Sequence, residues 1–218
     1  MNTPWHFLSH CLDADTPGFG GSVVFSRESL KSMKKGDSSN SERWVLNNHS
    51  GSHVDAPRHF SPDGKTVSDF EANHWVFGQV DLVELPTLEN AIIGIGAWCE
   101  NISSMCQLLL IKTGFETCRD SERYWRLNPG LSPALAFWLR DNRPHIRAVG
   151  FDFISLSAYS NRALGREAHV AFLGDNECPI LIFEDLKLSA CPPNPSQVIA
   201  LPLLVKDSDG SPITMIAK

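Results

Sequence analysis

The sequence contains no long apolar run. No stretch approaches the roughly 20 consecutive apolar residues that a membrane-spanning helix needs. The N-terminal residues, MNTPWHFLSHCLDAD, also lack the basic segment and apolar core of an export signal. We therefore expect no membrane association and a cytoplasmic location.

Basic residues are scarce as well. The chain has 19 Lys and Arg against 25 Asp and Glu, a formal net charge of -6, and apart from Lys34 and Lys35 the basic residues are scattered. A surface that binds nucleic acid needs clustered Lys and Arg to neutralise phosphates. Nucleic acid is therefore excluded as a partner.

Paired cysteines are also missing. The six cysteines, at positions 11, 99, 106, 118, 178 and 191, form no C-x-x-C pair and no tight framework like that of small secreted domains. We expect reduced, mostly buried thiols rather than disulfides. A closed structural zinc site is disfavoured too, because such sites use four ligands that usually include paired cysteines.

The composition that remains is that of an ordinary globular protein. The 218 residues, 42% of them hydrophobic, are enough for a substantial core, and we expect one domain over residues 1–218. Aliphatic and β-branched segments closed by Pro, Gly or polar clusters predict strands. The expected strands cover residues 76–85, 107–112, 146–151, 179–183, 198–205 and, after a turn at 207–210, 213–216. The prediction is an α/β fold with a large mixed β-sheet core and a few helices.

Only two helices are indicated. Ser132 is a candidate N-cap followed by Pro133 at the first helical position, and it predicts a helix through Arg140. A second helix is expected over residues 166–173, with His169 on its surface. Residues 18–43 are rich in Gly, Ser and Lys with little periodicity, which indicates a loop or lid.

The most informative segment is HSGSHVDAPRH, residues 49–59. Eight histidines spread evenly would place about 0.4 in an 11-residue window (8 × 11/218), whereas this one holds three and an aspartate. Gly51 and Pro57 oppose a helix. In an extended segment His53 and Asp55, two apart, project to one side, and a turn at Gly51 lets His49 converge on the same point.

Two imidazoles and a carboxylate are ligand types that suit zinc or manganese. Three ligands leave coordination positions open for water and substrate, which is typical of a catalytic metal site and suits hydrolysis. The plainer alternative is a solvated cluster of histidines, or histidines that cap buried backbone groups. The spacing H-x-x-x-H-x-D-x-x-x-H favours the metal site.

The same segment, HSGSHVDAPRHF, resembles the H-x-G-T-H-x-D-x-P-x-H signature of the cyclase family of metal-dependent hydrolases. Ser52 stands in place of the usual Thr. The resemblance extends over most of the chain. Residues 109–114 resemble a strand ending in Arg-Thr-Gly, with Lys112 in place of Arg. Residues 148–156 resemble a Gly-Ile-Asp-x-x-Ser strand, and residues 165–169 with 182–186 resemble the closing His and Glu-Asn-Leu block.

The resemblance implies a swivelling β/β/α-type domain that binds one or two divalent ions, Zn or Mn, in each subunit. It implies that the first metal is held by His49, His53 and Asp55. Asp55 would bridge to a second metal held by His169 and Glu184. Glu177 remains a rival for the late carboxylate ligand.

His59 is implied as the proton donor or acceptor. On its own, His169 would be a helix histidine without an assigned role, and Glu184 a carboxylate at a strand end. The resemblance also implies a homodimer or higher homo-oligomer in which a neighbouring subunit contributes to the pocket rim. Residues 18–43 are the candidate for that rim.

The activity implied by the resemblance is hydrolysis of a carbon–nitrogen amide bond in an N-formyl arylamine. One alternative is ring opening of a cyclic amide such as isatin, or of a lactone. A second is a non-catalytic protein that uses the metal to bind a small ligand. The aromatic residues available to stack on an aromatic substrate include Trp5, Phe19, Phe25, Phe60 and Trp75.

Overall fold

A mixed sheet of nine strands organises the chain, and the computed structural model describes residues 4–174 and 178–218. The strands follow the order β5-β12-β13-β4-β11-β10-β8-β6, and β1 pairs with β13. Their bounds are β1 (His6–Phe7), β4 (His53–Asp55), β5 (Val76–Phe77), β6 (Val80–Glu84), β8 (Leu108–Lys112), β10 (Ala148–Phe151), β11 (Leu181–Glu184), β12 (Val198–Pro202) and β13 (Gly210–Ala217). The predicted α/β class with a large mixed sheet is confirmed.

Four neighbouring strands, β6, β8, β10 and β11, run parallel, whereas β4, β13, β12 and β5 join antiparallel. The residues of β8 from Leu108 to Ile111 are fully buried. Strands covered on both faces read as continuous apolar runs. This burial explains why the aliphatic runs located β8, β10 and β11 to within a few residues.

The prediction of one strand over residues 76–85 was wrong. The chain breaks at Gly78 and Gln79, so that β5 pairs with β12 and β6 pairs with β8. These two short strands are the opposite ends of the strand order, and only two residues join them. The sheet therefore curves round until its edges approach each other.

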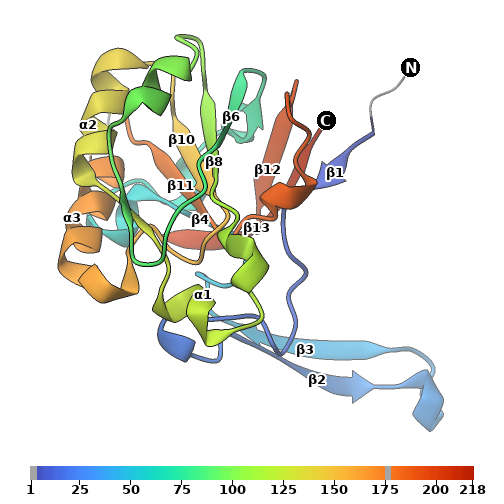
Figure 1. The fold of residues 1–218 in the computed structure, drawn as a ribbon. Helices are drawn as coiled ribbons and strands as arrows, with labels where there is room; N and C mark the ends of the chain where they lie inside the picture. The colour runs from blue at the N-terminus through green and yellow to red at the C-terminus, as the bar shows by residue number, and fades with distance from the viewer. Residues whose placement is uncertain (1–3, 175–177) are drawn as a thin grey trace.

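Helices α2 (Pro133–Asn142) and α3 (Arg162–Leu173) pack against each other on one side of the sheet (Figure 1). The predicted N-cap of α2 is confirmed, because Ser132 Oγ accepts a hydrogen bond from the Ala134 backbone N–H at 3.3 Å. Helix α3 starts four residues earlier than predicted. His169 lies on its inner face and is only 4% exposed, so the expectation of a surface histidine was wrong.

The remaining helical segments are short. Helix α1 covers Glu122–Arg126. Two two-residue strands, β7 (Ile92–Ile93) and β9 (Gly130–Leu131), pair in parallel as a separate small sheet. The 3-10 segments cover residues 19–21, 33–35, 57–59, 67–69, 72–75, 97–101, 115–118, 159–161 and 188–190. No helix in the described part of the chain is long and apolar enough to cross a membrane.

Residues expected to form a loop instead form an antiparallel hairpin of β2 (Phe25–Lys31) and β3 (Ser41–Leu46), which projects away from the sheet (Figure 1). Nearly all of its side chains are exposed on both faces. A strand without a buried face shows no alternation of apolar and polar residues. For that reason the sequence pattern missed it.

Five cysteines are free thiols. Of these, Cys99, Cys106 and Cys191 are buried, Cys118 is half-buried and Cys11 is exposed. The expectation of reduced thiols therefore holds for these five, and burial holds for three of them.

Candidate metal centre

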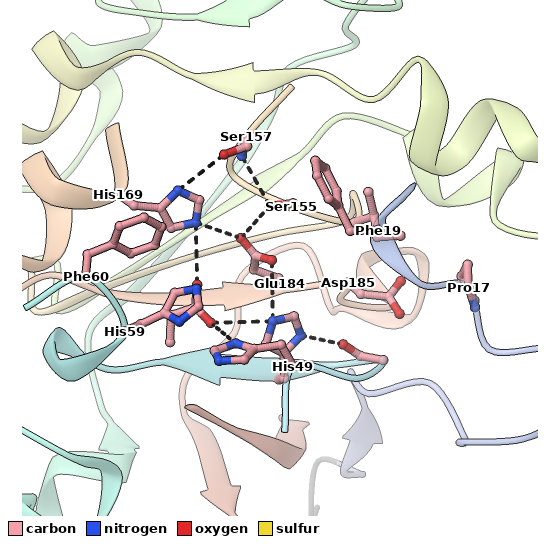
Figure 2. Close-up of a pocket in the computed structure, with 14 residues that line it drawn as sticks. Pro17, Phe19, His49, His59, Phe60, Ser155, Ser157, His169, Glu184 and Asp185 are labelled. Atoms are coloured by element: carbon pink, nitrogen blue, oxygen red, sulfur yellow. Dashed lines mark hydrogen bonds and ion pairs between the residues drawn. The ribbon is translucent and has the colours of Figure 1, made fainter. Parts of the chain in front are cut away.

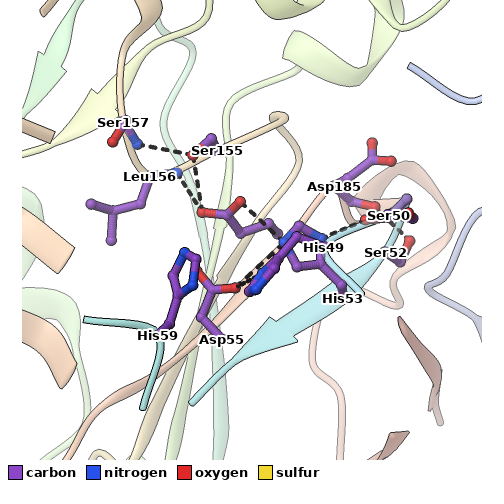
Figure 3. A network of polar contacts seen from close by, with 12 residues as sticks. His49, Ser50, Ser52, His53, Asp55, His59, Ser155, Leu156, Ser157 and Asp185 are labelled. Atoms are coloured by element: carbon purple, nitrogen blue, oxygen red, sulfur yellow. Dashed lines mark hydrogen bonds and ion pairs between the residues drawn. The ribbon is translucent and has the colours of Figure 1, made fainter. Parts of the chain in front are cut away.

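The register of the sheet brings the first site residues together. Strand β4 lies between β11 and β13, with His53 opposite Glu184 and Asp55 opposite Ile182. Residues two apart in a strand point to the same face, so His53 and Asp55 project together. Glu184 projects to that face as well because it pairs directly with His53. Figure 3 shows the side chains of His53 and Asp55 in this polar network.

A turn in the preceding loop brings in His49. Gly51 has a φ of +57°, in the left-handed region that favours glycine, and an added Cβ would lie 2.6 Å from Leu12 Cδ2. The turn places His49 Nδ1 2.7 Å from Asp55 Oδ1. The expectation that Gly51 would let His49 converge on His53 and Asp55 is confirmed.

Four of the predicted residues form a buried cluster in which His53, Asp55, His169 and Glu184 are each at most 4% exposed. Figure 2 shows two of them, His169 and Glu184, with their side chains directed at each other. His53 Nε2 lies 3.5 Å from Asp55 Oδ1 and 3.4 Å from Glu184 Oε2. His169 Nε2 lies 3.5 Å from Asp55 Oδ2 and 3.6 Å from Glu184 Oε1. Each imidazole therefore faces both carboxylates.

Backbone carbonyls fix the orientation of both buried rings. Nδ1 of His53 lies 2.7 Å from the Gly51 carbonyl oxygen, and Nδ1 of His169 lies 2.8 Å from the Gly165 carbonyl oxygen. Each Nδ1–H donates, so in the neutral rings the Nε2 lone pairs point at anionic oxygens. Lone pairs and carboxylates that face one another repel unless a cation lies among them, and a divalent metal fits this donor set.

Without a metal, protons fill that role. Burial alone would lower the pKa of His169, but hydrogen bonds and charge attraction from Asp55 and Glu184 outweigh it and raise the pKa to about 10. The same balance, with Asp55 and Asp209 as the anions, raises the pKa of His49 to about 9. Metal ligands must be deprotonated, so a bound cation would displace these protons.

Glu184 is held in place by the loop after β10. The Leu156 backbone N–H donates to Glu184 Oε1 at 2.7 Å, and the Ser155 hydroxyl donates to the same oxygen at 3.3 Å. The other oxygen, Oε2, remains directed at His53. Residues 148–156, which resemble a family strand, thus support the late carboxylate.

The next residue, Asp185, anchors the turn that follows Glu184. It has a φ of +52°, and its carboxylate accepts hydrogen bonds from Arg119 at 2.7 Å and from the buried Tyr124 hydroxyl. Its backbone carbonyl accepts from Ser52 Oγ at 2.5 Å. The hydroxyl retained at Ser52 therefore links the signature segment to this turn.

A second motif ties two strand ends together. The buried Asp152 carboxylate accepts hydrogen bonds from the Thr113 backbone N–H, the Thr113 hydroxyl and the Gly114 backbone N–H at 2.6–2.9 Å. Lys112 points elsewhere and pairs with Glu84 at 2.8 Å. The Lys-Thr-Gly segment and Asp152 therefore have a structural role, because their contacts hold the ends of β8 and β10 together.

His59 lies at the rim of the cluster. It ends a 3-10 turn, residues 57–59, and its side chain is 29% exposed. Its ring centroid lies 4.0 Å from that of His49, while the next residue, Phe60, stacks on His169 at 4.6 Å. His59 is therefore beside the buried cluster and accessible from the cavity.

Asp209 is a site residue that the sequence did not predict. Its Oδ2 lies 3.0 Å from His49 Nε2 and 2.8 Å from His59 Nδ1. The residue was noted only as part of the turn over residues 207–210, which the structure places directly before β13. No spacing could link it to histidines 150 and 160 positions earlier, because only the pairing of β13 with β4 brings it near.

The cluster forms the wall of a cavity of about 290 Å³. Of the aromatic residues considered for substrate contact, Phe19 and Phe60 line it. Phe25 and Trp75 are buried elsewhere, and Trp5 lies beside Lys218. Ligand pockets span roughly 300–1,000 Å³, so this cavity suits a small molecule. Glu177, the rival for the late ligand, lies outside the described residues.

The chain is similar in sequence to one family of known proteins. The Cyclase family model matches residues 7–158. The chain is 30% identical over 213 residues to a kynurenine formamidase of Geobacillus thermodenitrificans (strain NG80-2), covering 98% of this chain and 96% of the relative.

Solved structures share the fold. Isatin hydrolase A from Labrenzia aggregata, bound to benzyl benzoate, superposes with a TM-score of 0.83 at 21% identity, covering 98% of this chain and 93% of that one. A predicted metal-dependent hydrolase from Bacillus stearothermophilus gives a TM-score of 0.74 at 18% identity, covering 98% and 97%. The expected β/β/α-type fold is confirmed by these similarities.

Proposed function

The chain belongs to the cyclase family, and from that membership we propose that it is a metal-dependent hydrolase that cleaves the carbon–nitrogen amide bond of an N-formyl arylamine. The full-length relative named kynurenine formamidase supports this substrate class. One observation carries the proposal. Imidazoles and carboxylates face one another in a buried cluster, beside a small cavity with a further histidine at its rim.

The metal would be held by the buried cluster together with His49. His49, His53 and Asp55 would bind the first ion, and Asp55, His169 and Glu184 a second. Nitrogen and carboxylate donors without thiolate suit Zn or Mn. A divalent cation supplies Lewis acidity, which polarises a carbonyl and lowers the pKa of water toward ~7.

The chain's own residues would move the proton and orient the substrate. His59 Nε2 would take a proton from the attacking water and deliver it to the departing amine nitrogen, which is a poor leaving group unless protonated. Phe19 and Phe60 would contact the aryl ring in the cavity.

The test is turnover with and without metal. We expect purified protein to hydrolyse formanilide, to lose that activity after chelation and dialysis, and to regain it with Zn or Mn. Full activity in protein shown by elemental analysis to be free of metal would overturn the proposal.

Isatin and a lactone, measured in the same assay, distinguish the ring-opening alternative, which the isatin hydrolase structures favour. A protein that binds these compounds only with metal present, yet turns over none of them, would be the non-catalytic binding protein instead.

We further propose that the protein is a homodimer or higher homo-oligomer. The β2–β3 hairpin exposes Leu30, Met33, Trp44 and Val45, with exposed fractions of 48–64%. A lone two-stranded hairpin is marginally stable in water, so a second copy that covers it would explain its apolar surface. We also propose a cytoplasmic location and a single domain over residues 1–218. The five free thiols support the location.

A further inference from the structure

We infer that Asp209 is a positioning residue that fixes the tautomers of His49 and His59 through one carboxylate oxygen. This inference rests on the proposed function, in which His49 binds metal and His59 moves the proton. It adds a residue that lies outside both the signature segment and the buried cluster.

The contacts of Asp209 are those of a shared acceptor. Oδ2 lies 3.0 Å from Nε2 of His49 and 2.8 Å from Nδ1 of His59. The two rings lie 4.0 Å apart at an interplanar angle of 33°. A carboxylate can only accept, so each of these nitrogens must carry a proton and donate it.

These two donors determine the free nitrogen of each ring. With Nε2–H of His49 committed to Asp209, its Nδ1 is left to face Asp55, 2.7 Å away, where the metal would bind. With Nδ1–H of His59 committed, its Nε2 is left as the proton-transfer atom. Among the described residues Nε2 of His59 has no hydrogen-bond partner. Carboxylates that orient metal-binding or catalytic histidines in this way are a general device.

Asp209 is itself held firmly. The Asn48 side-chain amide donates to Oδ1 at 2.6 Å, so both carboxylate oxygens are engaged. The Asp209 backbone carbonyl accepts from the Ala56 N–H at 2.9 Å, which ties the turn to the residue after β4. Next to it, Gly210 leaves room for the His49 ring, because an added Cβ would lie 2.3 Å from His49 Cε1.

The test uses the whole protein and two readouts besides turnover. Asp209→Ala removes the acceptor, and Asp207→Asn is the control, since it removes an exposed carboxylate from the same turn and asparagine tolerates the φ of +61° at this position. In Asp209→Ala we expect zinc affinity, measured by chelator competition, to fall 10- to 100-fold. In ¹⁵N NMR of zinc-loaded protein labelled at histidine, we expect the Nδ1–H tautomer of His59 to be lost.

For the turnover of formanilide, kcat should fall about 100-fold or more with a smaller change in KM. Asp207→Asn should match the wild type in every measurement. Zinc affinity and a His59 tautomer in Asp209→Ala that equal those of Asp207→Asn would overturn the inference.

If Asp209→Ala does not fold, Asp209→Asn serves instead, because it keeps the shape and one acceptor oxygen. A fall in zinc affinity and a mixture of His59 tautomers support the inference, and wild-type behaviour in both overturns it. A wild-type protein that hydrolyses none of the substrates would end the proposed function, whereas zinc affinity and tautomer would still decide the role of Asp209.

Discussion

His59 differs from the buried residues in being accessible from the cavity, and its substitution should separate chemistry from metal binding. In His59→Ala we expect the metal content to stay at the wild-type value and kcat to fall 10²- to 10⁴-fold, the range for loss of a general acid or base. Elemental analysis and a formanilide assay measure the two quantities.

The control for this variant is His145→Ala, which removes an exposed histidine far from the cavity. It should keep both metal and rate. An unchanged rate in His59→Ala, or an equal loss in both variants, would contradict the role of His59.

The buried histidines should make the metal-free protein sensitive to alkali. The pKa of His169 is raised to about 10, against about 6.5 in an unfolded chain. The protonated ring therefore stabilises the folded state fully below pH 6.5, and this contribution is lost as the pH rises through 10. The urea midpoint of metal-free protein should fall between pH 7 and pH 10.

The matched variant is His169→Gln, which cannot bind the proton. Its urea midpoint should fall less over the same pH interval. Parallel curves for the two proteins would show that His169 does not bind a proton in the folded state.

Single residues of the site were predictable where they lie close in sequence. His49, His53, Asp55 and His59 fall within 11 residues, so their density alone indicated a metal site. His169 and Glu184 entered only through the family resemblance. Asp209 carried no local signal, because it reaches the histidines only through the register of β13 on β4.

At the scale of elements, the pairing of β13 with β4 needs a glycine at its start. Gly210→Ala places a Cβ 2.3 Å from His49 Cε1, so the His49 ring must move. We expect zinc affinity, measured by chelator competition, to fall roughly tenfold or more, as for loss of a supporting contact.

Gly78→Ala is the control for that variant, since an added Cβ there meets no heavy atom within 4 Å. It adds the same methyl group, but in the link between β5 and β6. If both alanine variants bind zinc as the wild type does, the close approach of Gly210 to His49 does not affect zinc binding.

Elements were predictable in proportion to their burial. The aliphatic runs of β8, β10 and β11 lie in the middle of the sheet and are covered on both faces, which gave clear patterns. The break between β5 and β6 falls at Gly78 and Gln79, and the glycine is a local signal that the prediction of one strand overlooked, because apolar residues continue on both sides of it. The β2–β3 hairpin buries almost nothing, and its pairing could be seen only in three dimensions.

At the scale of the whole molecule, contacts within one chain do not account for the exposed apolar side chains of the β2–β3 hairpin. Trp44 and Val45 are adjacent in β3 and therefore point to opposite faces, yet they are 64% and 62% exposed. A hairpin that packs on nothing loses conformational entropy with little apolar burial in return. Contact with a second copy would bury both faces.

We therefore expect light scattering after gel filtration to give the mass of a dimer or a larger assembly for the wild type. Replacing Trp44 and Val45 together by serine should shift the mass toward the monomer of 24.1 kDa. Leu88→Ser is the control, because Leu88 is 81% exposed but lies outside the hairpin. A monomeric wild type, or an assembly that the double substitution leaves intact, would show that the hairpin faces are not the interface.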